Sequence, residues 1–183
     1  MTAVPALPFP RSYWVSPGKL LAGCYPGDFD PVVARQKLQG LVAAGVTQVI
    51  SLMDAGEVDN CGRPFVDYRP EVENLAAEIG RAVVCRRFEI PDMGVPTMGR
   101  MSAILDAIDK EGARGGCTYV HCWGGKGRTG TVVGCWLMRQ DPASADDALL
   151  RLAALTAHNR AAFPEIPQTD GQRRFVCFWL PGA

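Results

Sequence analysis

Residues 117–130 have the sequence Cys-Thr-Tyr-Val-His-Cys-Trp-Gly-Gly-Lys-Gly-Arg-Thr-Gly and lead directly into an apolar segment. The first six of these residues fit a buried strand, and residues 127–139 fit a helix. A strand, a glycine-rich turn and a helix form a recurring phosphate-binding unit. The glycines let backbone N–H groups point inward, and the helix adds the positive end of its dipole. The stretch therefore predicts an anion site where a strand meets a helix.

Strands and helices alternate on both sides of this stretch. Strands are predicted at residues 19–24, 46–53, 82–90 and 117–122, and helices at residues 31–44, 71–79, 97–110, 127–139, 144–157 and 170–180. Helix starts are signalled by capping residues, namely Asp30 before Pro31, then Thr97, and Ser144 with Asp147. Residues 54–69 are polar and predict a surface loop. The alternation predicts an α/β fold with a central, largely parallel sheet flanked by helices.

The domain organisation follows from length and composition. The chain has 183 residues with 48% hydrophobic and 21% charged residues, which suits one folded domain. We expect residues 1–11 to be an N-terminal arm and residues 12–183 to be a single domain. Lys plus Arg and Asp plus Glu are both 19, so no global basic field predicts a nucleic-acid partner.

Targeting and metal signals are also missing from the sequence. No stretch approaches the roughly 20 apolar residues that span a bilayer, and the first residues show no secretory signal. Seven cysteines without a Cys-x-x-Cys pair, and two histidines, favour neither a disulfide framework nor a zinc site. We therefore expect a cytoplasmic monomer that needs no cofactor or metal and does not insert stably into membranes.

Cys122 begins the glycine-rich stretch, and Lys126 and Arg128 follow it closely. Inward amides and nearby cations favour the thiolate, which is the nucleophilic form of cysteine. Arg128 has a planar guanidinium that can bind two phosphoryl oxygens at once. A buried cysteine beside solvated cations is the alternative interpretation, but it leaves the combination of these residues in one short loop unexplained.

The motif His121-Cys122-x5-Arg128-Thr129 resembles the signature of the protein tyrosine phosphatase superfamily, especially its dual-specificity branch. The resemblance implies that Cys122 attacks phosphorus, Arg128 binds the phosphoryl group, Thr129 stabilises the leaving thiolate and His121 holds the loop. It also implies a phosphate cradle formed by Trp123, Gly124, Gly125, Lys126, Gly127 and Arg128. Residues 13–23 are similar to the opening strands of such domains, so the resemblance covers residues 12–180 and makes residues 12–183 a phosphatase domain.

Asp92 is the candidate general acid. A leaving oxygen needs a proton, and Ile90-Pro91-Asp92 stands 30 residues before Cys122 on a predicted turn. A Pro-Asp dipeptide alone is a common turn signal. Beside the cysteine loop it resembles the family's mobile Trp-Pro-Asp loop, with Ile90 in place of tryptophan. Asp54 and Glu57 are competing carboxylates, and we rank them below Asp92.

Gln168 and Gln172 lie in a segment that resembles the family's glutamine loop. The resemblance implies that Gln168 positions the hydrolytic water and that Gln172 supports it. Thr169 also fits a simple helix N-cap, and both interpretations can hold together.

The sequence predicts hydrolysis of phosphate monoesters through a phosphocysteine intermediate. Phosphotyrosine and phosphoserine/threonine proteins, or a small phosphorylated molecule, are the expected substrates. Phosphoinositide phosphatases of this superfamily often carry two loop lysines, and here Lys126 is present while Trp123 occupies the other position. An inositide substrate is therefore an alternative, as is a catalytically silent phosphopeptide-binding module. Cys61 or Cys85 is a candidate redox partner of Cys122.

Overall fold

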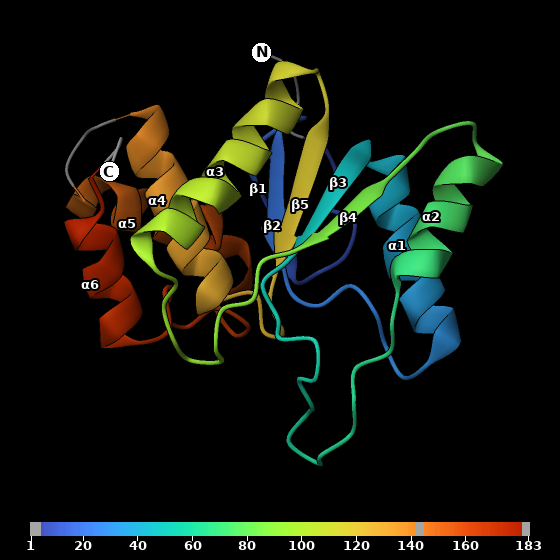
Figure 1. Ribbon diagram of the computed structural model, residues 1–183, viewed down its shortest axis with the longest axis horizontal. Coiled ribbons are helices and arrows are strands. Elements are labelled where there is room, and N and C mark those ends of the chain that lie inside the picture. The colour runs from blue at the N-terminus through green and yellow to red at the C-terminus, as the bar shows by residue number, and fades with distance from the viewer. Residues whose placement is uncertain (1–4, 142–144, 181–183) are drawn as a thin grey trace.

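The computed structural model describes residues 5–141 and 145–180, which form a twisted sheet between two layers of helices (Figure 1). The strands of the sheet are β1 (Ser12–Ser16), β2 (Leu20–Gly23), β3 (Val46–Ser51), β4 (Val84–Arg87) and β5 (Cys117–His121). Their order is β1-β2-β5-β3-β4. Only the β1–β2 pair is antiparallel among these, because β2, β5, β3 and β4 all run in one direction.

The helices divide unequally between the two faces of the sheet. One face carries α1 (Pro31–Ala43) and α2 (Arg69–Glu78). The other carries α3 (Met98–Ala113), α4 (Arg128–Gln140), α5 (Ala145–Leu155) and α6 (Asp170–Phe178), with a short 3-10 helix, η1, at Ala157–Asn159. The prediction of an α/β fold with a central, largely parallel sheet flanked by helices is confirmed. Within the described residues, no helix combines the length and the apolar character needed to cross a bilayer.

Local signals located most helix starts correctly. The Asp30 side chain accepts hydrogen bonds from the backbone N–H groups of Val32 and Val33, and the Thr97 side chain accepts one from Arg100. Asp147 lies in the first turn of α5, whereas the predicted cap at Ser144 lies outside the described residues.

The strand predicted at residues 82–90 is shorter than expected, since β4 ends at Arg87. Beyond it, the N–H groups of Phe88 and Ile90 still donate to the carbonyl groups of Ser51 and Leu52. Pro91 then has no N–H to donate, and the chain turns so that Asp92 reaches Arg128.

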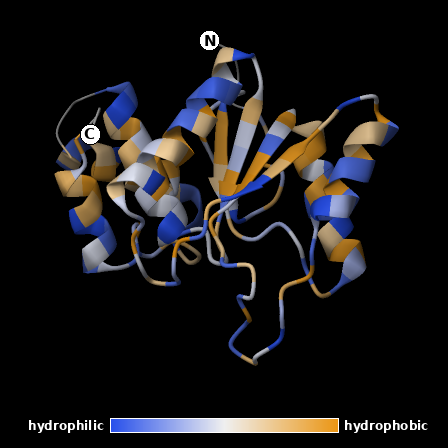
Figure 2. Cartoon of the chain, in the orientation of Figure 1, coloured by the Kyte–Doolittle hydropathy of each residue, from blue (hydrophilic) through white to orange (hydrophobic). Residues whose placement is uncertain are grey.

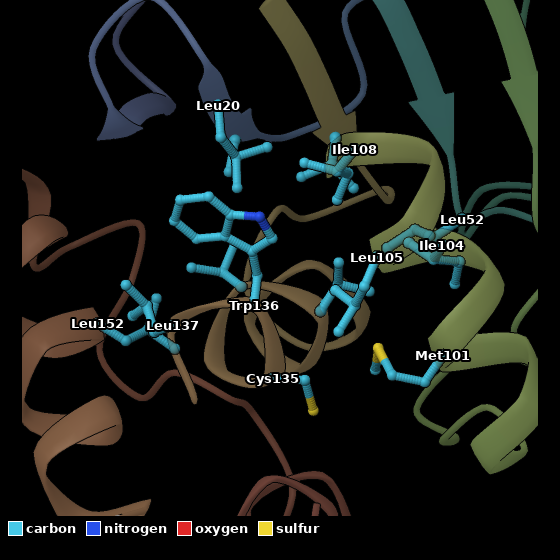
Figure 3. Close-up of a cluster of buried hydrophobic side chains, with 14 of the residues drawn as sticks. Leu20, Leu52, Met101, Ile104, Leu105, Ile108, Cys135, Trp136, Leu137 and Leu152 are labelled. Carbon is cyan, nitrogen blue, oxygen red and sulfur yellow. The ribbon is translucent and has the colours of Figure 1, made fainter. Parts of the chain in front are cut away.

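Alternation along the strands produces one hydrophobic core on each face. In β5, Tyr119 packs with the core under α1 and α2, and Val120 packs with the core under α3 to α6. Hydrophobic and hydrophilic residues occur on both the strands and the helices, and β2 is mostly hydrophobic (Figure 2). In the larger core, Trp136 of α4 lies among leucine and isoleucine side chains from β2 and α3 (Figure 3). Its indole N–H donates to Asp109 Oδ1 at 3.0 Å, so the buried ring keeps a polar partner.

Residues 5–11 lie against the domain rather than away from it. Phe9 is buried, and its carbonyl accepts a hydrogen bond from the N–H of Ser12 at 3.1 Å. Arg11 reaches further and donates to the carbonyl oxygen of Gly124 at 2.9 Å. The division between an arm at residues 1–11 and a domain at residues 12–183 stays a prediction, but the arm contributes contacts to the site.

The core can be tested on α5, which carries two leucines in opposite environments. Leu152 is fully buried and Leu150 is 68% exposed. Leu152→Ala should lower the free energy of unfolding by about 2–5 kcal/mol, since it removes buried methyl groups and leaves a cavity. Leu150→Ala is the matched control and should change it by less than about 0.5 kcal/mol. Urea titration measures both values, and equal losses would contradict the described packing of α5.

Candidate active site

The loop that follows β5 is fixed by close contact with the end of β2. Gly125 has a φ of +78°, and a Cβ at this position would lie 2.5 Å from the carbonyl carbon of Gly23. A side chain is therefore excluded at Gly125 by both conformation and space. The N–H of Tyr25 also donates to the carbonyl of Trp123 at 3.0 Å. These contacts with β2 and with the residues after it define the shape of the loop.

Cys122 stands at the start of this loop, directly after the last residue of β5. Its side chain is almost completely buried, and its Sγ accepts the N–H of Gly125 at 3.3 Å. Gly127 precedes the first residue of α4, so Cys122 and the positive end of that helix lie at the same junction. The prediction that the other backbone amides of residues 123–128 form a phosphate cradle stays a prediction.

His121 lies beneath the loop and is fully buried. Its Nε2 lies 2.6 Å from the Tyr68 hydroxyl, and its Nδ1 lies 3.3 Å from the carbonyl oxygen of Cys122. Burial lowers the pKa of His121 to about 3, and the positive charges of Arg87 and Arg128 act in the same direction, so the ring is neutral. In the tautomer that satisfies both contacts, Nδ1–H donates to the Cys122 carbonyl and Nε2 accepts from Tyr68. This position suits the predicted role of His121 as the residue that holds the loop.

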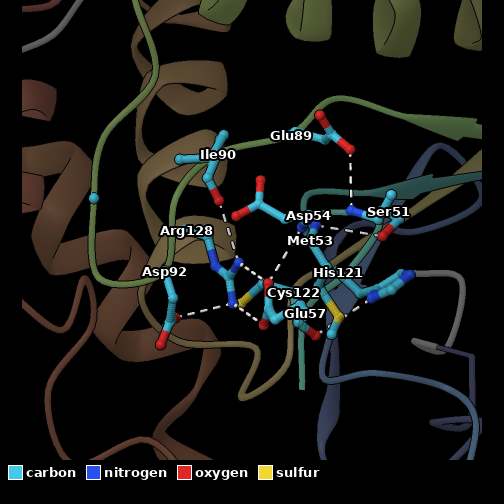
Figure 4. Close-up of polar contacts among 12 residues, drawn as sticks. Ser51, Met53, Asp54, Glu57, Glu89, Ile90, Asp92, His121, Cys122 and Arg128 are labelled. Carbon is cyan, nitrogen blue, oxygen red and sulfur yellow. Dashed lines mark hydrogen bonds and ion pairs between the residues drawn. The ribbon is translucent and has the colours of Figure 1, made fainter. Parts of the chain in front are cut away.

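Arg128, the first residue of α4, is 2% exposed and is bound by three groups (Figure 4). Its two terminal nitrogens donate to the two carboxylate oxygens of Glu57 at 2.6 and 2.8 Å. One of them also donates to the carbonyl oxygen of Ile90 at 3.2 Å, and the other lies 3.0 Å from Asp92 Oδ1. A guanidinium has five N–H groups, so the three hydrogen bonds leave two donors, Nε–H and one N–H of the nitrogen that lies beside Asp92. A phosphate that binds two N–H groups on one edge would therefore take these two, next to the Asp92 carboxylate.

Glu57 is the residue whose role the sequence did not reveal. It was a competing candidate for the acid, but both of its oxygens are occupied by Arg128, and its side chain is only 9% exposed. Burial opposes the charge of Arg128, yet its hydrogen bonds to Glu57 and the nearby negative charges of Cys122, Glu57 and Asp92 raise its pKa above the ordinary arginine value. Glu57 therefore keeps the guanidinium charged and fixed in orientation. The other competing carboxylate, Asp54, lines a separate hollow with His121 and Tyr68.

Asp92 reaches the site from the turn after β4. Its side chain is 54% exposed, and the N–H of Gly94 closes the turn on the carbonyl of Pro91 at 2.9 Å. Met93 takes a φ of +59°, an uncommon conformation for a residue with a side chain. Asp92 thus combines contact with Arg128 and access to solvent, as a proton donor for an entering substrate requires.

The glutamine segment joins the Asp92 turn to the cysteine loop. Thr169 and Gln172 form a reciprocal capping box at the start of α6, in which the Gln172 side chain accepts the N–H of Thr169. The side-chain amide of Gln172 also donates to the carbonyl of Gly94 at 3.0 Å. A Cβ placed on Gly127 would lie 3.4 Å from Gln168 Oε1, which puts that amide beside the loop. Both predicted glutamines therefore lie at the site, with Gln172 bridging two of its loops.

Thr129, in the first turn of α4, is fully buried. Its hydroxyl has no hydrogen-bond partner within the described residues. Buried hydroxyl groups normally have one, so this donor is free for a group that changes charge during a reaction. The predicted role of Thr129 toward the leaving thiolate uses such a donor.

One cleft with a volume of about 400 Å³ is lined by Cys122, Arg128, Asp92 and both glutamines. The cleft is lined by Arg11, Asn60, Asp92, Met93, Cys122, Trp123, Gly124, Lys126, Gly127, Arg128, Gln168 and Gln172. His121 and Thr129 lie outside this lining. The described part of the chain contains no group of three or more His, Cys, Asp or Glu side chains placed to hold a metal ion. The site therefore presents a cysteine, an arginine and a carboxylate to one small volume.

Comparison with known proteins identifies the family. Residues 10–176 match the family model described as PTP-SAK, a Swiss Army Knife protein, DSP-PTPase phosphatase domain. The chain belongs to this family. It is thus a member of the cysteine-based protein tyrosine and dual-specificity phosphatases, as the motif around Cys122 predicts.

Individual relatives share part of the chain. Protein tyrosine phosphatase domain-containing protein 1 of Danio rerio is 33% identical over 148 residues, which are 75% of this chain and 19% of that relative. Phosphatidylglycerophosphatase and protein-tyrosine phosphatase 1 of Mus musculus is 33% identical over 73 residues, or 39% of this chain and 38% of that relative. The crystal structure of Tk-PTP in the active form has the same fold, with a TM-score of 0.69 and 22% identity over 92% of this chain and 95% of that chain.

Glu57→Gln tests the partner of Arg128. The variant keeps the size of the side chain but removes its charge, so Arg128 loses its fixed orientation. We expect the kcat/KM for a small aryl phosphate to fall roughly 10- to 100-fold, the effect of losing a charge-assisted hydrogen-bond pair. The matched control is Asp67→Asn, which removes an exposed ion pair with Arg69 in the same loop and should leave kcat/KM unchanged. Equal effects of the two variants would contradict the assignment.

Asp92→Ala separates proton donation from anion binding. The kcat for an aryl phosphate should fall about 10²- to 10⁴-fold because the leaving oxygen loses its acid. Tungstate, a phosphate analogue, should bind several-fold more tightly, since the negative charge of Asp92 no longer pairs with Arg128. Inhibition constants measure this binding. Weaker binding of tungstate by the variant would show that Asp92 helps to form the anion site instead of competing for it.

Proposed function

We propose that the protein hydrolyses phosphate monoesters through a phosphocysteine intermediate, most directly on phosphotyrosine and phosphoserine/threonine proteins. The observation that supports this proposal most directly is that Cys122, Arg128 and Asp92 line one cleft of about 400 Å³. Membership of the cysteine-based phosphatase family supports the reaction type. The arginine and the loop amides supply the electrostatic stabilisation that such chemistry needs.

In the first step, the Cys122 thiolate attacks phosphorus and the bond from phosphorus to the leaving oxygen breaks. Asp92 in its acid form gives its proton to that oxygen. The phosphate takes Nε–H and the neighbouring N–H of Arg128, so the Asp92 carboxyl group is released toward the leaving group. Glu57 keeps its two hydrogen bonds to Arg128 throughout, since they occupy the other N–H groups.

In the second step, water attacks the phosphocysteine and the bond between sulfur and phosphorus breaks. Asp92 accepts a proton from that water, and the Gln168 side chain, which lies beside Gly127, orients it. The Cys122 thiolate leaves, and the free hydroxyl of Thr129 is the donor that stabilises it. The site then returns to its starting charge.

Two observations bear on the substrate and the location. The chain has no Lys-Asn-Arg-Tyr motif of the tyrosine-specific members, which favours a site that also accepts phosphoserine and phosphothreonine. All seven cysteines are free, and a reactive thiol is preserved in a reducing compartment, so we propose a cytoplasmic location.

A phosphorylated lipid or inositol head group is the second candidate substrate. Lys126 lines the cleft and adds a positive charge beside the phosphate position. The name of the mouse relative combines phosphatidylglycerophosphatase with protein tyrosine phosphatase, so related domains are assigned to both kinds of substrate.

Cys122→Ser tests the nucleophile. The wild-type protein, quenched with acid during turnover of a ³²P-labelled phosphopeptide, should carry label on Cys122, whereas Cys122→Ser should carry none and lose essentially all activity. The control is Cys135→Ser on α4, a buried cysteine away from the cleft lining, which should still form the labelled intermediate. Turnover should also continue in the presence of a chelator. Binding of phosphopeptide without labelling or hydrolysis would instead favour a catalytically silent module.

A further inference from the structure

Two cations stand together at the entrance to the cleft, one from the N-terminal arm and one from the cysteine loop. A Cβ placed on Gly124 would lie 3.7 Å from Lys126 Cε and 3.8 Å from a terminal nitrogen of Arg11. Both side chains line the same cleft as Cys122 and Arg128. Arg11 and Lys126 therefore converge over a single glycine, two residues from the nucleophile.

The charges of these two residues are not balanced by the groups around them. Arg128 is matched by Glu57 and Asp92, which are already bound to it. Within residues 5–141 and 145–180, neither Arg11 nor Lys126 forms an ion pair. Arg11 donates instead to the carbonyl of Gly124, which takes one of its five N–H groups. The entrance thus keeps two positive charges beyond those that the scissile phosphate needs.

We propose that Arg11 and Lys126 form a second anion subsite, and that among small phosphorylated substrates the preferred one carries a second phosphate close to the one that is hydrolysed. This inference rests on the proposed phosphatase function. Two converging cations match a phosphate dianion better than a single carboxylate. Their position over Gly124, two residues from Cys122, places the two anions close together. Inositol rings with phosphates on neighbouring carbons have this chemistry, either as free molecules or as lipid head groups. The cleft volume of about 400 Å³ lies within the range of sites for small molecules, roughly 300–1,000 Å³.

The experiment compares the kcat/KM for an inositol bisphosphate with neighbouring phosphates and for an inositol monophosphate. The wild-type protein should prefer the bisphosphate by roughly tenfold or more, the effect of a charged hydrogen-bonding group. Arg11→Ala should abolish most of this preference, and Arg11→Lys, which keeps the charge, should retain most of it. The control is Lys19→Ala, in the turn between β1 and β2 at the other end of β5, which should leave the preference intact.

Two further arms identify the source of the second anion. The same bisphosphate head group on a diacyl lipid in phosphatidylcholine vesicles tests the membrane form of the substrate. A preference for the bisphosphate that depends on Arg11, with the free molecule or with the lipid, supports the subsite. Phosphotyrosine peptides with aspartate or asparagine beside the phosphorylated residue test the protein form. A preference that depends on Arg11 and is confined to the acidic peptide would overturn the proposal.

Other outcomes separate this inference from the proposed function. Turnover of an aryl phosphate that depends on Cys122, with no preference for the bisphosphate or a preference unaffected by Arg11→Ala, would overturn the subsite and leave the phosphatase function standing. Absence of turnover on every ester, the aryl phosphate included, would overturn both.

Discussion

The buried ion pair between Arg128 and Glu57 is the constraint on which the arrangement of the site depends. A guanidinium that is 2% exposed must have its charge compensated, and Glu57 does so with both oxygens. The loop after β3 therefore brings Glu57 to the first residue of α4. The same loop continues to Tyr68, which contacts His121, so the compensation of one charge also fixes the support beneath Cys122.

The site assembles from segments that are far apart in the chain because β3, β4 and β5 are parallel and end at one edge of the sheet (Figure 1). The ends of β3, β4 and β5 lead to Glu57, to Asp92 and to Cys122. Gln172 closes the group from the opposite side, with one side-chain atom in its own helix cap and another on Gly94. A single glutamine thus links the last helix to the loop that carries the acid.

The sequence was most informative where function depends on neighbours in the chain. Cys122, the glycines and Arg128 lie in one stretch, and the caps Asp30 and Thr97 act within three residues, so local patterns predict them. The roles of Glu57 and Arg11 could not be predicted from the sequence, because their partners are 71 and 113 positions away in the chain. A carboxylate just after a strand that ends at the same edge as Cys122 is a usable signal for Glu57. Nothing comparable marks Arg11, whose role arises from how the arm packs.

The place of β5 in the sheet gives the proposed nucleophile and the proposed acid different local stabilities. β5 is bonded to β2 on one side and β3 on the other, so its amide hydrogens exchange with solvent when the whole domain unfolds. Asp92 follows β4, the edge strand, and its turn is held mainly by single contacts to Arg128 and Gln172. Opening of that turn is a separate, less costly event. The fold therefore keeps the proposed nucleophile in the most stable part of the sheet and places the proposed acid in a turn that can open locally.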